Sequence, residues 1–220
     1  MNKTQLTNFI TKYTLGGEIK STKWTSNGDS LSTRFISGDK SVVGNVVLSK
    51  FNHLSPCELG VYNTGQLTSL LSVLGDDIEV NLSQSGDKFI SMEFADTKRK
   101  TKSKYMLSDL SVIPTPPELK NLPDSFELGI KVDPYFINTF ISGKGALSEA
   151  ETFTILTENG ETKIVIGYAS IASNRVTIPV ETTKSADIEP ISFNANMFAS
   201  ILSANKDCES ATLEVSSAGL

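Results

Sequence analysis

The sequence predicts an α+β protein built from two duplicated domains, and three observations support this fold class. Four segments carry the cap and the apolar spacing of an amphipathic helix. The stretches between them are short, rich in Thr, Val, Ile and Phe, and broken by Gly-containing turns, which is typical of antiparallel strands. A proline-rich segment near the middle divides the chain into halves with the same helix spacing. At 220 residues, each half is long enough to bury a core of its own.

The clearest helix lies between Val61 and Gly75. Asn63 is a good N-cap, because its side-chain oxygen can accept from the amides of the first turn. Gly75 suits the left-handed residue that ends a helix. One apolar face is formed 4, 7, 8 and 11 positions after the cap, by Leu67, Leu70, Leu71 and Leu74. This segment serves as a template for the rest of the chain.

The same template follows three further caps, Asn2, Asp133 and Asn194. The distance between caps is 61 residues in each half, and the two halves are offset by 131 residues. The glycines at 16 and 17 are expected to stop the first helix. The apolar faces consist of Leu6, Phe9, Ile10 and Tyr13; of Ile137, Phe140 and Ile141; and of Phe198, Ile201 and Leu202. Four matched helices at matched intervals indicate an internal duplication.

Strands are predicted between these helices. The first group lies between residues 17 and 51, with turns at 27–29 and 38–39. The other predicted strands are 78–82, 89–94, 105–110, 126–132, 152–157, 163–169, 175–182 and 188–193. Residues 113–123 carry four of the eight prolines, so we expect them to form an extended connector. The predicted domains are then residues 1–112 and 124–220.

The helix faces opposite the apolar ones carry short uncharged side chains, where a solvated helix usually has Glu and Lys. No Asp or Glu occurs in 3–14, 64–74, 134–144 or 195–206, and four lysines give these segments a charge of +4 against −9 elsewhere. An acidic protein that keeps acids off four equivalent surfaces is suited to a polyanion. The alternative is that Ser and Thr are there by composition alone. The candidate residues are Lys3, Thr4, Asn8, Thr11, Lys12, Ser72, Asn138, Ser142, Lys144, Ser203 and Lys206.

The fourfold repeat of strand, helix and strands, the duplication and the proline-rich connector resemble the DNA polymerase sliding clamps, the processivity factors of the DNA clamp superfamily. The lengths and the texture of residues 62–77 and 126–143 are most similar to the clamps of T-even-type tailed bacteriophages. The resemblance implies a DNA clamp fold and a homotrimeric ring, with antiparallel sheets outside and two helices of each domain inside. Such a ring encircles double-stranded DNA without reading its sequence, and the candidate residues above would face that DNA.

The resemblance also implies partners. It implies a replicative DNA polymerase tethered for processivity, a clamp loader and late-transcription factors, no cofactor, and the cytoplasm of the infected bacterial host as location. Such clamps receive short hydrophobic C-terminal peptides in an apolar pocket beside the connector, which would fall here at Leu110, Val112, Ile113 and Leu122. The simpler alternative is that these four residues anchor the connector to the core.

The repeat further predicts that the second domain lacks its last two strands. In the first half 47 residues, Thr64 to Leu110, follow the cap Asn63, whereas 26 residues follow Asn194. We therefore expect no counterpart of strands 89–94 and 105–110, and we expect the chain to be a fragment of a longer clamp with an exposed sheet edge. In the resembling clamps the strand equivalent to 105–110 pairs with the neighbouring subunit's equivalent of 175–182.

An enzyme finds little support in the sequence. The single histidine, His53, lies in a predicted strand or turn, no GxSxG or HExxH motif occurs, and the GKG segment 143–145 lacks the flanking residues of a phosphate loop. The sequence leaves open whether any pair of Asp or Glu residues is catalytic. Cys57 and Cys208 are far apart and favour free thiols over a disulfide or a zinc site. We expect a protein without catalytic or metal-binding residues.

No run approaches the ~20 apolar residues of a membrane span, and the N-terminus lacks the pattern of a secretory signal, so we expect a cytosolic protein without membrane contact. The basic stretch Lys98 to Lys104 is expected to be a solvated hairpin and is a secondary candidate for contact with DNA. The alternative for the whole chain is a non-enzymatic, β-rich phage structural protein.

Overall fold

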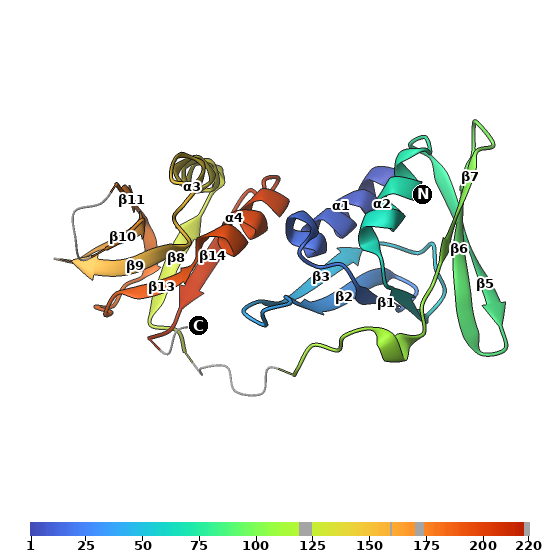
Figure 1. Ribbon diagram of the computed structural model, residues 1–220, viewed down its shortest axis with the longest axis horizontal. Helices are drawn as coiled ribbons and strands as arrows, with labels where there is room; N and C mark the ends of the chain where they lie inside the picture. Colours follow the sequence, from blue (N-terminus) through green and yellow to red (C-terminus); the bar gives the residue numbers. More distant parts are fainter. Residues whose placement is uncertain (119–124, 159, 170–173, 218–220) are drawn as a thin grey trace. The chain divides into compact units, whose positions relative to one another are not determined.

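The computed structural model describes residues 1–118, 125–158, 160–169 and 174–217. The chain divides into two compact units, Met1–Glu118 and Leu119–Leu220, here called unit 1 and unit 2. In the described residues each unit is mixed α+β, with two α-helices and antiparallel strand pairs (Figure 1). The boundary between the units falls inside the predicted connector. Residues 114–118 form neither helix nor strand, and residues 119–123 of that prediction, Leu122 included, lie outside the described residues.

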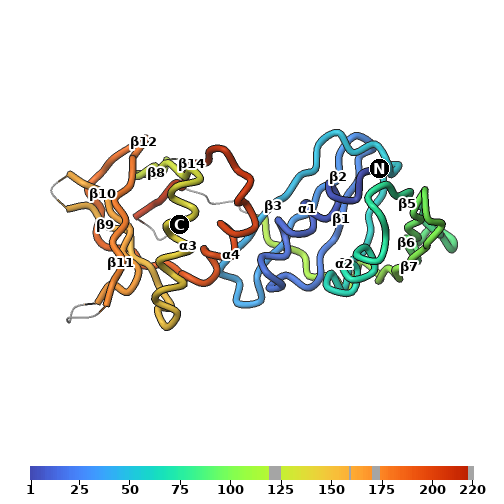
Figure 2. The backbone as a smooth tube through the Cα atoms, turned by 90° about the horizontal axis from the view of Figure 1, so that it is seen from above, coloured from blue at the N-terminus to red at the C-terminus, as the bar shows by residue number. Residues whose placement is uncertain are grey.

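Unit 1 contains a four-stranded sheet in the order β3-β2-β1-β4 and a three-stranded sheet in the order β5-β6-β7. Its elements are α1 (Lys3–Thr14), η1 (Leu15–Gly17), β1 (Thr22–Ser26), β2 (Ser30–Ile36), β3 (Val43–Ser49), β4 (Cys57–Val61), α2 (Thr64–Ser72), β5 (Ile78–Ser85), β6 (Lys88–Asp96), β7 (Lys102–Met106) and η2 (Leu110–Val112). In the view from above (Figure 2), α1 runs over the larger sheet; it is in contact with β3, and its Phe9 and Tyr13 rings meet Trp24 of β1. The helices therefore cover one face of the larger sheet.

Unit 2 also contains a four-stranded sheet, β11-β10-β9-β13, and a three-stranded one, β12-β8-β14. Its elements are β8 (Leu128–Val132), α3 (Pro134–Ala146), β9 (Thr152–Glu158), β10 (Glu161–Ile166), β11 (Val176–Pro179), β12 (Thr182–Lys184), β13 (Ile191–Asn194), α4 (Ala195–Ala204) and β14 (Ala211–Val215). No strand was predicted at β14, and the predicted strand 175–182 reaches β12 only at Thr182. Both β12 and β14 are short, and both pair with β8, which lies far from them in sequence.

The two units repeat one order of elements. In each, a helix is followed by three strands of one sheet, a further strand that joins this sheet beside the first of the three, and a second helix. Unit 2 differs in that β12, a strand of its other sheet, lies between the third strand and the further one. Three strands follow α2, whereas one strand, β14, follows α4 in the part of the chain that is described. The sheets of both units nevertheless contain the same number of strands, because β8 and β12 join β14. The matched order supports the predicted internal duplication.

All four predicted helix caps are confirmed. The side-chain oxygens of Asn2, Asn63, Asp133 and Asn194 accept hydrogen bonds from first-turn amides at 2.7–3.0 Å. The predicted apolar faces point inward, and most of their residues are buried. The partly exposed exceptions are Leu70, Ile141, Phe198 and Ile201. The first helix ends one residue before the predicted glycines, at Leu15, a left-handed C-cap with a φ angle of 46°. Gly16 and Gly17 follow it with positive φ angles of 72° and 103°.

Gly75 does not end α2 in the predicted way. The helix ends at Ser72, its C-cap Val73 is right-handed, and Gly75 is not among the glycines with positive φ. Its lack of a side chain matters for another reason. A Cβ at Gly75 would lie 2.5 Å from Oδ2 of Asp96, and the Gly75 amide donates to that oxygen at 2.7 Å. The glycine allows the loop after α2 to close onto the β6–β7 hairpin.

Two predicted strands have different boundaries in the structure. The strand predicted at 105–110 is wrong in its second half, because β7 ends at Met106 and residues 110–112 form the turn η2, capped by Asp109. The single strand predicted at 175–182 is in fact two, β11 and β12. The first pairs with β10 and the second with β8, so the chain passes from one sheet to the other at this point.

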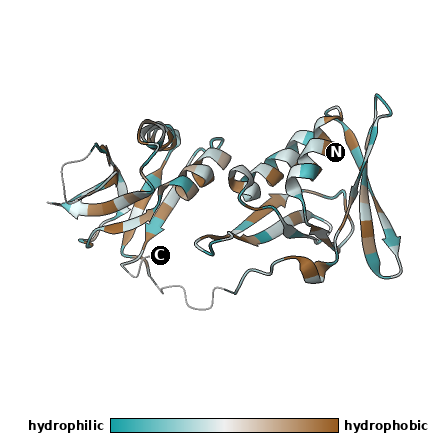
Figure 3. Cartoon of the chain, in the orientation of Figure 1, coloured by the Kyte–Doolittle hydropathy of each residue, from teal (hydrophilic) through white to brown (hydrophobic). Residues whose placement is uncertain are grey.

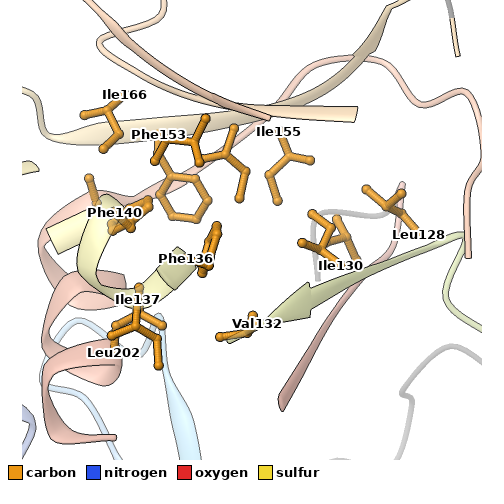
Figure 4. Packing of buried hydrophobic residues seen from close by; sticks show 14 of the residues in the cluster. Leu128, Ile130, Val132, Phe136, Ile137, Phe140, Phe153, Ile155, Ile166 and Leu202 are labelled. Atoms are coloured by element: carbon orange, nitrogen blue, oxygen red, sulfur yellow. The ribbon is translucent and has the colours of Figure 1, made fainter. Parts of the chain in front are cut away.

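Each unit has its own aromatic core. In unit 1 the rings of Phe9, Tyr13 and Trp24 meet edge to face, with centroids 5.5–6.4 Å apart, and the Trp24 Nε1 donates to the Tyr13 hydroxyl at 3.2 Å. In unit 2 the corresponding place is held by Phe140, whose neighbours Phe136 and Phe153 are shown in Figure 4. These rings fix the helices against the larger sheets.

Two glycines of α3 are expected to respond oppositely to replacement by Ala. A Cβ at exposed Gly145 would meet nothing within 4 Å, so Gly145→Ala should raise the free energy of unfolding by up to about 1 kcal/mol. A Cβ at buried Gly143 would lie 3.0 Å from Val176 and 3.3 Å from Ile166, so Gly143→Ala should lose that gain to crowding. Urea unfolding of both variants measures the difference, and equal stabilisation would contradict this packing of α3.

Candidate nucleic-acid surface and partner-binding hollows

The outward faces of α1 and α2 are polar and free of charged carboxylates. Thr4, Asn8, Thr11 and Ser72 are all exposed, as predicted. The buried side of α1 carries Leu6, Phe9, Ile10 and Tyr13 against the sheet. Figure 3 shows the two helices mostly in pale, weakly hydrophilic colours, with a few brown residues. Within unit 1 these faces form one acid-free surface on the side of the sheet that the helices cover.

Several hydroxyl groups of this surface donate to carbonyls of their own helix. The Thr11 hydroxyl donates to the carbonyl of Thr7 at 2.9 Å, and the Ser72 hydroxyl donates to the carbonyl of Ser69 at 2.7 Å. Equivalent bonds within the helices are made by Thr7, Thr14, Thr68 and Ser69. Because the protons point back to the backbone, the faces present methyl groups and acceptor lone pairs. Direct donation from these hydroxyls to a phosphate would require breaking such a bond.

The predicted lysines lie in different surroundings. Lys144 is a correction to the predicted surface, because it is 8% exposed and its Nζ donates to the Ser148 carbonyl at 2.8 Å, beyond the end of α3. The Lys3 ammonium donates to the carbonyl of Leu74, so it ties the start of α1 to the loop after α2. Lys12 is partly exposed in the last turn of α1, and Lys206 is exposed in the turn after α4. Lys12 and Lys206 therefore stay as candidates for contact with an external anion.

The outward faces of α3 and α4 carry the remaining predicted residues. Asn138, Ser142 and Ser203 are exposed. Tyr135, which is 77% exposed in the first turn of α3, is a large side chain on this otherwise small-residue face. Unit 1 has 13 basic and 12 acidic residues, for a net charge of +1, whereas unit 2 has 7 and 13, for −6. The acid-free helix faces of unit 2 therefore contrast with an otherwise acidic unit.

The four residues predicted for the partner pocket lie in different surroundings. Leu110 and Val112, in the turn η2, are exposed, and Figure 3 shows this turn as a strongly apolar segment. Ile113 is 5% exposed and packs toward Gly60, so it anchors the turn, as the simpler alternative expects, and leaves little surface open to a partner. Leu122 lies outside the described residues, and its part in the pocket is untested.

Two hollows lie beside η2, and Leu110 borders both. One, of about 320 Å³, is lined by Arg34, Asn45, Leu110, Ile113, Pro114 and Pro116, among others. The other, of about 330 Å³, is lined by Gly60, Phe89, Ile90, Leu107, Asp109 and Leu110, among others. The Lys88 ammonium pairs with Asp109 at the second hollow and holds the pKa of that carboxyl well below its usual range. Phe89 and Ile90 were not predicted for the pocket, because their place beside η2 depends on the pairing of β6 with β7.

A further hollow of about 580 Å³ lies at the start of α2 and was not predicted. Its lining includes Thr14, Lys20, Tyr62, Asn63 and Gly65.

Among the described residues no group of three or more His, Cys, Asp and Glu side chains could hold a metal ion. No helix in the described ranges is long and apolar enough to cross a membrane. His53 is exposed, with its ring edge-on to Phe51 at 5.2 Å.

These surfaces are interpreted from their own residues and geometry. Neither a family model nor a curated protein matches the chain.

Proposed function

We propose that this chain is the subunit of a DNA sliding clamp, which encircles duplex DNA and tethers a replicative polymerase to it. The observation that carries the proposal is the repeat: two units with one order of elements, each with two capped helices whose outward faces lack acids. A DNA clamp fold and a homotrimeric ring belong to the proposal. Repeated equivalent faces are what a ring needs to present a uniform lining to a helical polyanion.

The chemistry of those faces suits sliding better than tight binding. Hydroxyls such as that of Thr11, bonded back to the helix, leave contact with phosphates to intervening waters. A few cations, Lys12 and Lys206 among them, would supply a weak and sequence-independent attraction. Because few direct contacts with phosphates would have to break at each step, the protein could move along the duplex. The closed ring around the DNA would keep it bound.

The partner site fits the same proposal. The hollow of about 330 Å³ beside η2 combines exposed Leu110 with Phe89 and Ile90, which suits the apolar anchor of a short peptide. A polymerase tail held there would follow the clamp along DNA. A clamp loader and late-transcription factors would use the same class of contact.

The direct test is topological. The protein, loaded by its cognate loader onto closed circular duplex DNA, should be retained through gel filtration at moderate salt, and linearising the circle should release it. It should also lengthen the products of its cognate polymerase. A protein that stays on linear DNA equally well, or that leaves product length unchanged, is no clamp. The second result would favour the alternative of a β-rich phage structural protein.

The two remaining lysines predict a charge effect on processivity. Lys12→Glu combined with Lys206→Glu should shorten polymerase products by about tenfold at moderate salt, because two attractive contacts with phosphates become repulsive. Product length on a primed circular template is the measurement. The matched control is Lys40→Glu together with Lys50→Glu, two exposed lysines in the turns that flank β3. Equal shortening in the control would remove Lys12 and Lys206 from the DNA-facing surface.

A further inference from the structure

The basic stretch of the sequence forms a β-hairpin with a tightly fixed tip. Residues 97–101 connect β6 to β7, and the tip is built around Asp96. One oxygen of the Asp96 carboxylate accepts from the amides of Lys98 and Arg99 at 2.8 Å, and the other accepts from the amide of Gly75 at 2.7 Å. The Asp96 amide donates to the Thr101 carbonyl at 2.8 Å and closes the turn. The acidic group beside the basic stretch is therefore engaged in shaping its backbone.

The tip is also tied to the loop after α2. The Lys98 ammonium pairs with Asp77 at 2.8 Å, and the Thr97 amide donates to the Asp77 carbonyl at 3.1 Å. Backbone amide donors keep the pKa of Asp96 below its usual range, and the Lys98 ammonium does the same for the pKa of Asp77. Both anchors therefore stay ionised at neutral pH. In Figure 1 the tip projects beyond the end of α2, on the side of unit 1 that the helices cover.

Three cationic side chains of the hairpin take no part in these contacts. Arg99 and Lys100 are exposed at the tip, and Lys104 is exposed on β7. Among the residues that the structure describes, none of the three is in an ion pair, whereas Lys102 pairs with Glu93 at 3.3 Å. Positive charges held this way on an ordered turn lose little conformational entropy when they meet an anion.

We propose that Arg99, Lys100 and Lys104 bind the phosphate backbone of duplex DNA, as a contact separate from the helix faces. The proposal rests on the proposed function for the identity of the anion. Residues 97–101 contain no apolar side chain, so the tip has nothing to insert into a lipid surface. Lys is depleted from protein interfaces, whereas Lys and Arg supply the phosphate contacts that dominate sequence-independent DNA binding. A duplex is therefore the polyanion that this tip fits best.

The test is the salt dependence of binding to a short linear duplex, followed by fluorescence anisotropy with the full chain. The variant Arg99→Gln/Lys100→Gln/Lys104→Gln should bind about tenfold more weakly at low salt. The slope of log affinity against log salt should become less steep by about 0.9 for each phosphate that the variant no longer neutralises, so by about 2 to 3. The matched control removes the same number of exposed lysines elsewhere in unit 1, Lys20, Lys40 and Lys50, each changed to Gln. Its slope should stay within about 1 of the wild type.

Further variants make the outcome decisive. The charge-conserving set Arg99→Lys/Lys100→Arg/Lys104→Arg should restore binding, and unchanged thermal unfolding of all variants shows that the fold is kept. The proposal would be overturned by an unchanged slope in the neutral variant or by equal weakening in the control. It would also be overturned if the neutral variant bound phosphatidylserine vesicles more weakly than the wild type does but bound the duplex equally well. A wild type that does not bind the duplex at low salt would overturn it as well. Retention on closed circles is measured separately, so a functional hairpin on a protein that fails to encircle DNA would be recognised.

Discussion

Phe140→Ala is expected to lower the free energy of unfolding of unit 2 by about 3–5 kcal/mol. Phe140 is 0% exposed, and its ring meets Phe198 edge to face at 4.9 Å and Phe153 at 5.1 Å. Figure 4 shows Phe140 on α3 facing Phe153 of β9. Truncation would remove the ring that joins α3 and α4 to the sheet and leave a cavity that backbone shifts could fill only in part.

The measurement can separate the two units. Trp24 is the single tryptophan and lies in unit 1, so its fluorescence reports unit 1, while far-ultraviolet circular dichroism reports both units. In Phe140→Ala, a dichroism transition should move to lower urea, and a Trp24 transition that stays in place would show that the units unfold independently. Tyr135→Ala, an exposed ring in the same helix, should change stability by less than about 0.5 kcal/mol. A decrease of less than about 1 kcal/mol for Phe140→Ala would contradict the described core.

The helices could be predicted because their signals are local. An N-cap such as Asn63 acts on an amide three residues away, and an apolar face is set by spacing within one helix. Gly75 was misread because its constraint comes from Asp96, 21 residues later, and not from its own φ angle. The strand β14 was missed, and β12 was not separated from β11, for the same kind of reason, since both β12 and β14 pair with β8, which lies far away in sequence.

The candidate surface was predicted less completely than the fold. Helical periodicity placed Thr11 and Ser72 outside, but only the structure shows that their hydroxyl protons are bonded to the backbone. The same periodicity could not show that Lys144 folds back over the end of α3 onto Ser148. A long side chain can adopt several rotamers, and the one it adopts depends on nearby hydrogen-bond acceptors whose positions cannot be predicted from the sequence.

Gly60→Ala is expected to displace the turn that carries η2. A Cβ at Gly60 would lie 2.3 Å from the Ser108 carbonyl oxygen and 3.5 Å from a side-chain carbon of Ile113. The Ser108 amide donates to the Gly60 carbonyl at 2.9 Å, so the two backbones approach closely at this bridge. Because a backbone carbonyl cannot rotate away as a flexible side chain can, the segment after β7 would have to move. The cost to unit 1 should be about 1–3 kcal/mol.

Gly60→Ala should also weaken peptide binding, if the hollows beside η2 hold the polymerase tail. Moving η2 would shift Leu110, which borders both hollows, and would release buried Ile113. Binding of a hydrophobic polymerase-tail peptide, followed by calorimetry, should weaken at least about tenfold, the equivalent of 1.4 kcal/mol. Amide exchange at Ser108 should accelerate in the same variant. The control is Gly38→Ala, where a Cβ would meet nothing within 4 Å. Faster exchange at Ser108 with undiminished peptide binding would place the partner site away from η2.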